Sequence, residues 1–214
     1  MTPFDKLFSE LKHRISSDSW LKARQHGRLR FAPELGYGRH FAPPFSTSKP
    51  AAVLVLLEPS AAEGEDWSIP LTVRPQHLPD HPGQISFPGG RLEAGESALD
   101  AAKREYEEEL GKPFQGAILG ELFPLFVYNS NYAVRPFLAI CESSQTYQPC
   151  PQEVERVVNL PLNVLVDERC QPISQFSRGT VSWTSRVFAH KQDQVWGATA
   201  IMLGEVAAIV RNLE

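Results

Sequence analysis

The clearest periodic pattern in the chain lies near its middle, where apolar positions recur every three or four residues. Leu99, Ala102, Tyr106 and Leu110 follow this spacing. Because one turn of an α-helix takes 3.6 residues, the four side chains would form a single stripe. The pattern predicts an amphipathic helix that buries this stripe against the rest of the protein.

Both ends of this helix are marked by residues that favour a helix boundary. Ser97 is followed three residues later by Asp100, an arrangement that resembles a capping box and predicts a helix start at Ser97. Gly111 suits the position just after the last turn, and Pro113 cannot continue a helix. The helix is therefore expected to end at Leu110.

Three carboxylates lie on a different face of the same helix. Glu105, Glu108 and Glu109 are spaced i, i+3 and i+4, and only Ala98 and Ala101 share their face in the preceding turns, so we expect open access to it. Like charges at this spacing repel one another unless a cation lies among them, and hard oxygen ligands suit Mg²⁺ or Mn²⁺. The alternative is an ordinary charged face in contact with solvent.

The remaining pattern predicts strands flanked by a few helices. Residues 4–15 have helical spacing and would pack on the domain or on a partner subunit. Residues 28–49 have no period and suggest an ordered arm or loop. We expect strands at 51–57, 67–74, 117–127 and 132–141, a loop at 77–90, strands or short helices at 157–166 and 180–190, and a closing helix at 198–213 with one apolar face. The order predicts an α/β sandwich with a mixed sheet, preceded by an N-terminal helix and arm over residues 1–50.

Composition narrows the functional classes. The chain has 214 residues, enough for one domain with a sizeable core, and its net charge of −4 argues against a nucleic-acid surface. No apolar run approaches the roughly 20 residues of a membrane helix. Three cysteines without metal-type spacing and scattered histidines favour reduced thiols over a zinc site. We expect a cytoplasmic protein, and a homodimer is compatible with the sequence.

The residues around the carboxylate helix resemble the Nudix box, a long and gapped motif. Its positions in this chain are Gly90, Glu96, Arg104-Glu105, Glu108-Glu109 and Gly111. Tyr106 and Lys112 depart from it, since both stand where the family usually has aliphatic residues. The resemblance implies a Nudix-type α/β/α sandwich, with residues 51–214 as the Nudix hydrolase domain.

The same resemblance implies hydrolysis of a nucleoside diphosphate linked to another moiety. Water attacks one phosphorus of the anhydride and the other phosphate leaves, at a site where the negative charge must be neutralised by cations. We hypothesise that Glu105, Glu108 and Glu109 hold one to three Mg²⁺ or Mn²⁺ ions. The carbonyl of Gly89 or Gly90 would complete the ligand shell, as the family implies.

The other charged residues of the motif are expected to support these ligands. Arg104 lies one turn before Glu108 and could orient it, while Glu96 could accept backbone N–H groups or pair with Arg104. Direct catalysis by either residue is the alternative. The general base is open between Glu105 and a glutamate of a later loop, for which Glu153 is the candidate by resemblance.

Further blocks are similar to the coenzyme A pyrophosphatases within this family. They are residues 71–74, 83–90, 132–137, 153–154, 161–162 and 196–200. Three prolines depart from the subfamily pattern, at Pro70, Pro75 and Pro79. Arginine is usual at the last of these positions and could pair with a phosphate, whereas proline has neither charge nor donor. Recognition of the 3′-phosphate of coenzyme A would then depend on other residues.

Arg74, Arg91 and Arg135 are the candidates to replace that arginine in substrate binding. The expected substrate is coenzyme A or an acyl ester, cleaved to adenosine 3′,5′-bisphosphate and 4′-phosphopantetheine. ADP-ribose or another nucleoside diphosphate derivative is the alternative substrate, and a binding module without catalysis is the alternative class.

Overall fold

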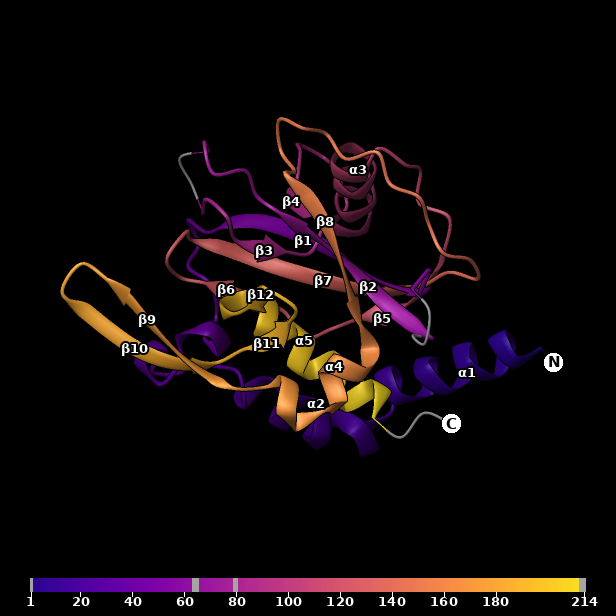
Figure 1. Ribbon diagram of the computed structural model, residues 1–214, viewed down its shortest axis with the longest axis horizontal. Helices are drawn as coiled ribbons and strands as arrows, with labels where there is room; N and C mark the ends of the chain where they lie inside the picture. The colour runs from indigo at the N-terminus through magenta and orange to yellow at the C-terminus, as the bar shows by residue number, and fades with distance from the viewer. Residues whose placement is uncertain (1, 63–65, 79–80, 212–214) are drawn as a thin grey trace.

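The computed structural model describes residues 2–62, 66–78 and 81–211 (Figure 1). Its α-helices are α1 Pro3–Ser16, α2 Leu21–Leu29, α3 Ala98–Leu110, α4 Leu162–Val166 and α5 Gly197–Val210, with 3₁₀ turns η1 Asp18–Trp20, η2 Glu34–Gly36, η3 Arg39–Phe41 and η4 Glu168–Cys170. Its strands are β1 Lys49–Pro59, β2 Trp67–Val73, β3 Ile85–Ser86, β4 Gly89–Arg91, β5 Ala117–Glu121, β6 Leu125–Val127, β7 Tyr132–Ile140, β8 Arg156–Pro161, β9 Ile173–Arg178, β10 Val181–Arg186, β11 Phe188–His190 and β12 Asp193–Val195.

The main sheet has eight strands and is mixed, which confirms the predicted α/β class. Strand β1 runs parallel to β7 along its length, from the pair Lys49 and Tyr132 to the pair Leu57 and Ile140. Strand β4 pairs with the start of β1, while β5 and β6 pair with β7, all three antiparallel. Strand β2 meets β1 only at its far end and pairs mainly with β8 and β3.

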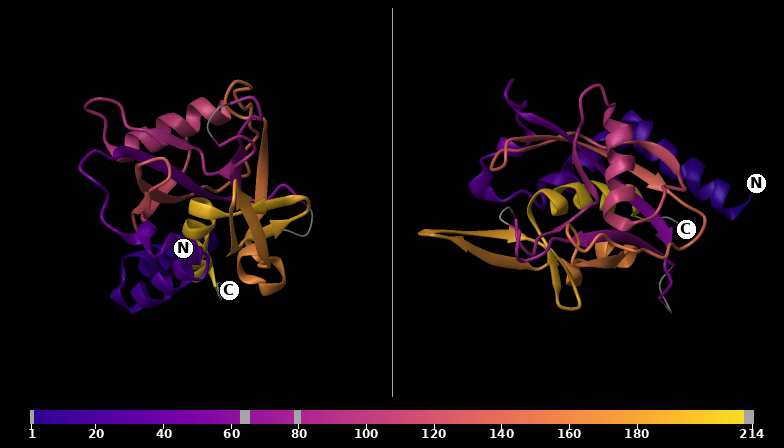
Figure 2. Two further views of the ribbon diagram at one scale, coloured as in Figure 1. Left: turned by 90° about the vertical axis from the view of Figure 1, so that its left-hand side faces the viewer. Right: turned by 90° about the horizontal axis from the view of Figure 1, so that it is seen from above.

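Two helical layers cover the two faces of this sheet (Figures 1 and 2). On one face, Ala52, Leu54 and Leu56 of β1 pack with Ala102 and Tyr106 of α3. On the other face, the alternate β1 residues join a larger core with α1 and α5. Because β1 is covered on both faces, its sequence is an uninterrupted apolar run instead of an alternating one.

Helix α5 lies between the sheet and α2. The prediction that it buries a single apolar face is wrong. Most of its residues are buried, because α2 covers the side that we expected to face solvent. Glu205 has no exposed surface and forms ion pairs with Arg24 and Arg28 of α2, at 2.7 and 3.7 Å. A buried carboxylate of this kind requires such partners, so these contacts fix α2 against α5.

Several local expectations need correction. The segment 28–49 begins inside α2 and contains η2 and η3, so it is more helical than its composition indicates. The strand expected over 117–127 is divided into β5 and β6, because the Phe123 amide donates to Glu205 instead of continuing the ladder. The expected loop at 77–90 contains the short strands β3 and β4. Strand β9 was not predicted, and it pairs with β10 in a hairpin that projects from the body (Figure 2).

The N-terminal segment packs onto the rest of the protein. Leu11 and Ile15 of α1 are buried, and Arg14 donates to the carbonyls of Ile209 and Arg211 at 2.9 and 2.7 Å. The division at residue 50 into an arm and a Nudix domain stays a prediction. None of the helices in the described part of the chain is long and apolar enough to cross a membrane.

Candidate active site

Helix α3 carries most of the predicted site, and its boundaries confirm the sequence prediction. The Ser97 hydroxyl accepts a hydrogen bond from the Asp100 amide at 3.2 Å and donates one to the Asp100 carboxylate at 2.6 Å. Gly111 ends the helix in the left-handed conformation, with φ of 65°. Glycine adopts this conformation without strain, which explains the sharp end of the helix.

The expected open access to the carboxylate face is wrong. Ala98 and Ala101 are 4% and 0% exposed and pack with β1 residues on the sheet side of α3. Their small side chains allow the helix to approach β1 and β4 closely. As a result, Glu105 and Glu109 face the sheet, and only Glu108 is well exposed, at 57%.

Glu109 occupies the most constrained position among the three carboxylates. Burial and, to a smaller extent, the negative charge of Glu105 together raise its pKa to about 8. Hydrogen bonds from the Thr72 hydroxyl, at 3.2 Å, and from the Gly89 backbone act in the opposite direction. The charged form of Glu109 is therefore disfavoured until a cation compensates for its burial.

Glu105 is held against strand β4. A Cβ atom added to Gly90 would lie 2.3–2.6 Å from the three carboxyl atoms of Glu105, so only glycine leaves room for this side chain. Burial raises the pKa of Glu105, although Arg104 opposes the shift through a hydrogen bond of 2.9 Å. The second glycine of the pair thus serves a steric purpose beyond forming a turn.

Arg104 connects the acidic residues of the motif. It donates to both carboxylate oxygens of Glu96, at 2.9 and 3.1 Å, and to Glu108 at 3.0 Å. It also donates to the backbone carbonyl of Arg91 at 3.0 Å. These contacts lower the pKa of Glu96 and raise that of Arg104. The expected pairings of Arg104 with Glu96 and Glu108 are both present.

Glu153 approaches the same carboxylates from the segment between β7 and β8. It is exposed, and its amide closes a turn on the carbonyl of Cys150 at 3.0 Å. Its negative charge raises the pKa of both Glu105 and Glu109. The structure therefore brings Glu153 into electrostatic contact with the helix glutamates, although they are more than 40 residues apart in the sequence.

The three candidate arginines are placed differently. Arg135, on the exposed side of β7, forms two hydrogen bonds to Glu121, at 2.7 and 2.6 Å, and must leave this pair to bind a phosphate. Arg91 ends β4 beside Arg104, and half-buried Arg74 follows β2. Pro79 lies outside the described residues.

The residues around α3 suit a hard divalent cation in their chemistry. They offer carboxylate oxygens, a half-buried pair of like charges (Glu105 and Glu109) and two glycines, Gly89 and Gly90, alongside. Within residues 2–62, 66–78 and 81–211, however, no three acidic, His or Cys side chains surround a common point. Arg104 binds Glu105 and Glu108 instead, so these two carboxylates must turn from Arg104 to share an ion.

Sequence reasoning missed Thr72 as a partner of Glu109. The sequence feature that could have indicated Thr72 is its polar side chain within the mostly apolar strand β2, where Thr72 is only 4% exposed. It also missed Tyr147, whose hydroxyl donates to buried Glu58 at 2.7 Å. No motif marks that pair, because Glu58 and Tyr147 meet only through the tertiary fold.

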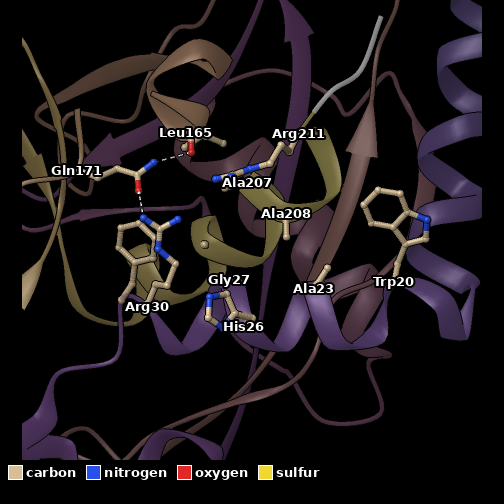
Figure 3. Close-up of a pocket in the computed structure, with 12 residues that line it drawn as sticks. Trp20, Ala23, His26, Gly27, Arg30, Leu165, Gln171, Ala207, Ala208 and Arg211 are labelled. Atoms are coloured by element: carbon tan, nitrogen blue, oxygen red, sulfur yellow. Dashed lines mark hydrogen bonds between the residues drawn. The ribbon is translucent and has the colours of Figure 1, made fainter. Parts of the chain in front are cut away.

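A cavity of about 260 Å³ lies on the other side of the protein, between α2, α4 and α5 (Figure 3). Its walls include Trp20, Gly27 and Leu165, and Gln171 bridges the Leu165 carbonyl and Arg30 at its edge, at 2.8 and 3.3 Å. None of the predicted site residues lines this cavity, so the proposed chemistry does not use it.

Comparison with known proteins identifies the family. The model of the NUDIX domain matches residues 48–183. The chain is 33% identical over 144 residues to the "Uncharacterized Nudix hydrolase NudL" of Escherichia coli (strain K12), a match that covers 64% of this chain and 72% of that protein. NudL of Salmonella newport (strain SL254) is 32% identical over the same length.

A solved structure of similar fold is the MutT/nudix family protein from Enterococcus faecalis. It has a TM-score of 0.51 and 14% identity, and the match covers 96% of this chain and 73% of that one. The chain therefore belongs to the NUDIX family and is a phosphoanhydride hydrolase of that family. Enzymes of this family act on small nucleotide substrates and generally require divalent metal ions.

Proposed function

We propose that this chain hydrolyses the pyrophosphate bond of coenzyme A or its acyl esters to adenosine 3′,5′-bisphosphate and 4′-phosphopantetheine. The observation that carries the hydrolytic part is Glu109, a half-buried carboxylate beside Glu105 whose pKa is raised to about 8. Such a pair costs stability in the free protein, and a divalent cation would remove that cost. The sequence blocks similar to coenzyme A pyrophosphatases support the substrate.

In this proposal, Glu105, Glu108 and Glu109, with the carbonyl of Gly89, would hold Mg²⁺ or Mn²⁺. When bound, the ion would supply charge neutralisation at the diphosphate and lower the pKa of the attacking water. In the metal-free protein Arg104 holds Glu105 and Glu108 through hydrogen bonds of 2.9 and 3.0 Å, which the two carboxylates would exchange for the ion. Glu96 in turn fixes the guanidinium of Arg104.

Substrate identity is tested by comparing substrates with and without the 3′-phosphate. We expect coenzyme A to be cleaved with a kcat/KM at least about tenfold above those of dephospho-coenzyme A and ADP-ribose, because an arginine–phosphate contact contributes more than about 1.4 kcal/mol. Turnover is measured with Mg²⁺ and with Mn²⁺, and the products are identified by mass spectrometry.

Equal rates for coenzyme A and its dephospho form would instead favour the alternative, a hydrolase of ADP-ribose or other nucleoside diphosphate derivatives. Tight binding of all three compounds without hydrolysis would favour a binding module. If coenzyme A is preferred, charge-removing variants of Arg74 and Arg91 would show which side chain contributes the discrimination. Arg135 is replaced together with Glu121, because removal of Arg135 alone would also leave the Glu121 carboxylate without its two hydrogen bonds to Arg135.

Glu153 is the proposed general base, because it is exposed and faces Glu105 and Glu109. Replacing Glu153 with Gln is expected to lower kcat by about 100-fold or more and to remove the acidic limb of the pH–rate profile. Glu155→Gln is the matched control, since Glu155 is also exposed and uses its backbone amide to bind Val73. An unchanged profile in Glu153→Gln would assign the base to Glu105.

A further inference from the structure

The segment from residue 147 to 155 carries Glu153 but contains no helix or strand. Its first part runs along the end of α3, where the amides of Gln148 and Cys150 donate to the carbonyls of Leu110 and Glu109 at 2.9 and 3.0 Å. Its last residue, Glu155, donates through its amide to Val73 of β2 at 2.8 Å. These backbone contacts and the buried side chain of Val154, next to Glu153, hold the later part of the segment in place.

One side chain anchors the start of this segment. The Tyr147 hydroxyl donates to Glu58 at 2.7 Å, and the Tyr106 hydroxyl donates to that of Tyr147 at 3.4 Å. The rings of Tyr106 and Tyr147 meet edge to face, with centroids 6.3 Å apart. Tyr106 belongs to α3 and lies next to Glu105, so the anchor joins the segment to the helix that carries the carboxylates.

Glu58, the acceptor of the Tyr147 hydrogen bond, lies in a buried position. It is 2% exposed near the end of β1, and burial raises its pKa to about 7. The groups that face it are the hydroxyl of Tyr147, the backbone of Gln145, Lys112, and the side chains of Tyr106 and Cys141. A buried carboxyl group needs hydrogen-bond donors, and Tyr147 supplies the donor from a side chain.

We propose that Tyr147, held by Glu58, is a positioning residue that fixes the 147–155 segment so that Glu153 faces Glu105 and Glu109. This inference rests on the proposed function, in which Glu153 is the base. Loss of the anchor would leave the backbone contacts of the segment but widen the range of positions open to Glu153. A displacement of about 1 Å in a catalytic group can cost about 100-fold in rate.

The first test compares Tyr147→Phe with Tyr37→Phe, a control at a residue that is 82% exposed. Tyr147→Phe is expected to lower kcat about tenfold, to leave KM unchanged and to shift the pH–rate profile. Glu58→Gln keeps an oxygen that accepts from Tyr147, so it should retain most of the activity, whereas Glu58→Ala should behave like Tyr147→Phe. A lower melting temperature with wild-type kcat and pH profile in Tyr147→Phe would overturn the proposal.

A double-mutant cycle with Glu153→Gln then tests whether Tyr147 affects kcat through Glu153. If Tyr147 acts through Glu153, Tyr147→Phe should cause no further loss of kcat in the Glu153→Gln background. Equal losses in both backgrounds would show that Tyr147 acts elsewhere and would overturn the proposal.

Cys150 provides a test that does not depend on catalysis. Its half-buried thiol donates to Gln152 at 2.9 Å inside the segment, whereas half-buried Cys170 lies outside the segment, in η4, and serves as an internal reference. Iodoacetamide should alkylate Cys150 several-fold faster in Tyr147→Phe than in the wild type, as followed by peptide mass spectrometry. An unchanged rate would overturn the proposal, while faster alkylation in an enzyme unaffected by Glu153→Gln would show that the positioning holds and that the assigned base is wrong.

Discussion

Replacing Glu109 with glutamine is expected to reduce kcat by at least about 100-fold while making the metal-free protein more stable at pH 8. Glutamine has nearly the same shape and keeps one oxygen for Thr72, but it binds a divalent cation poorly. The stability gain arises because the variant removes a half-buried negative charge that Glu105 repels. Turnover with Mn²⁺ and thermal unfolding at several pH values measure the two effects.

The direction of the stability change in Glu109→Gln follows from the pH dependence of the stability of the wild type. Burial raises the pKa of Glu109 to about 8 from an ordinary value of 4.5, so the folded protein holds a proton that the unfolded chain has lost. The stability of the metal-free wild type therefore falls as the pH rises from about 4.5 to 8, by on the order of a few kcal/mol. Glu109→Gln lacks this contribution, although Glu58, with a pKa of about 7, still titrates in part of the window.

Glu107→Gln is the matched control for Glu109→Gln. Glu107 lies on the same helix, is exposed, and accepts a hydrogen bond from the Phe114 amide at 3.1 Å, which glutamine can also do. Its replacement should leave turnover and the pH dependence of unfolding near those of the wild type. Wild-type turnover in Glu109→Gln would show that the Glu109 carboxylate is not a metal ligand and would refute the proposed site.

Replacing Gly90 with alanine is expected to reduce kcat about 100-fold with little loss of stability. The new Cβ would lie 2.3 Å from a carboxylate oxygen of Glu105, so that flexible side chain must move away from the site. Gly90 is not among the glycines with a left-handed backbone, so alanine can adopt its conformation. Steady-state kinetics and the melting temperature together distinguish this result from unfolding.

Two other glycines provide the comparison for Gly90→Ala. A Cβ at Gly36 would meet nothing closer than 3.5 Å, so Gly36→Ala should be nearly neutral. A Cβ at Gly89 would lie 2.4 Å from the Ala52 carbonyl oxygen and 2.6 Å from Val53 Cα, and backbone atoms cannot move aside as a side chain can. Gly89→Ala should therefore lose stability, and full activity in Gly90→Ala would contradict the steric explanation for Glu105.

Features that depend on local periodicity and capping could be predicted from the order of the residues. The limits of α3, the apolar run of β1 and the helical spacing of α1 follow from side chains that are close in the chain, and the structure reproduces them. The spacing of Arg104 and Glu108 likewise predicted their contact, since residues four apart meet on any helix. The motif that identifies the family is local in the same sense, because most of it lies on one helix and the loop before it.

The burial of each charge and the groups around it depend on contacts between parts of the chain that are distant in sequence. Glu105, Glu108 and Glu109 look equivalent in the sequence, yet strand β4 covers the first and last of them and leaves Glu108 exposed. The burial of α5 on all sides depends on α2, about 180 residues earlier, and the anchor of Tyr147 on Glu58 joins strand β1 to a distant segment. Desolvation and repulsion depend on distance in space, so no local pattern could predict that Glu109 would hold its proton up to a pH of about 8.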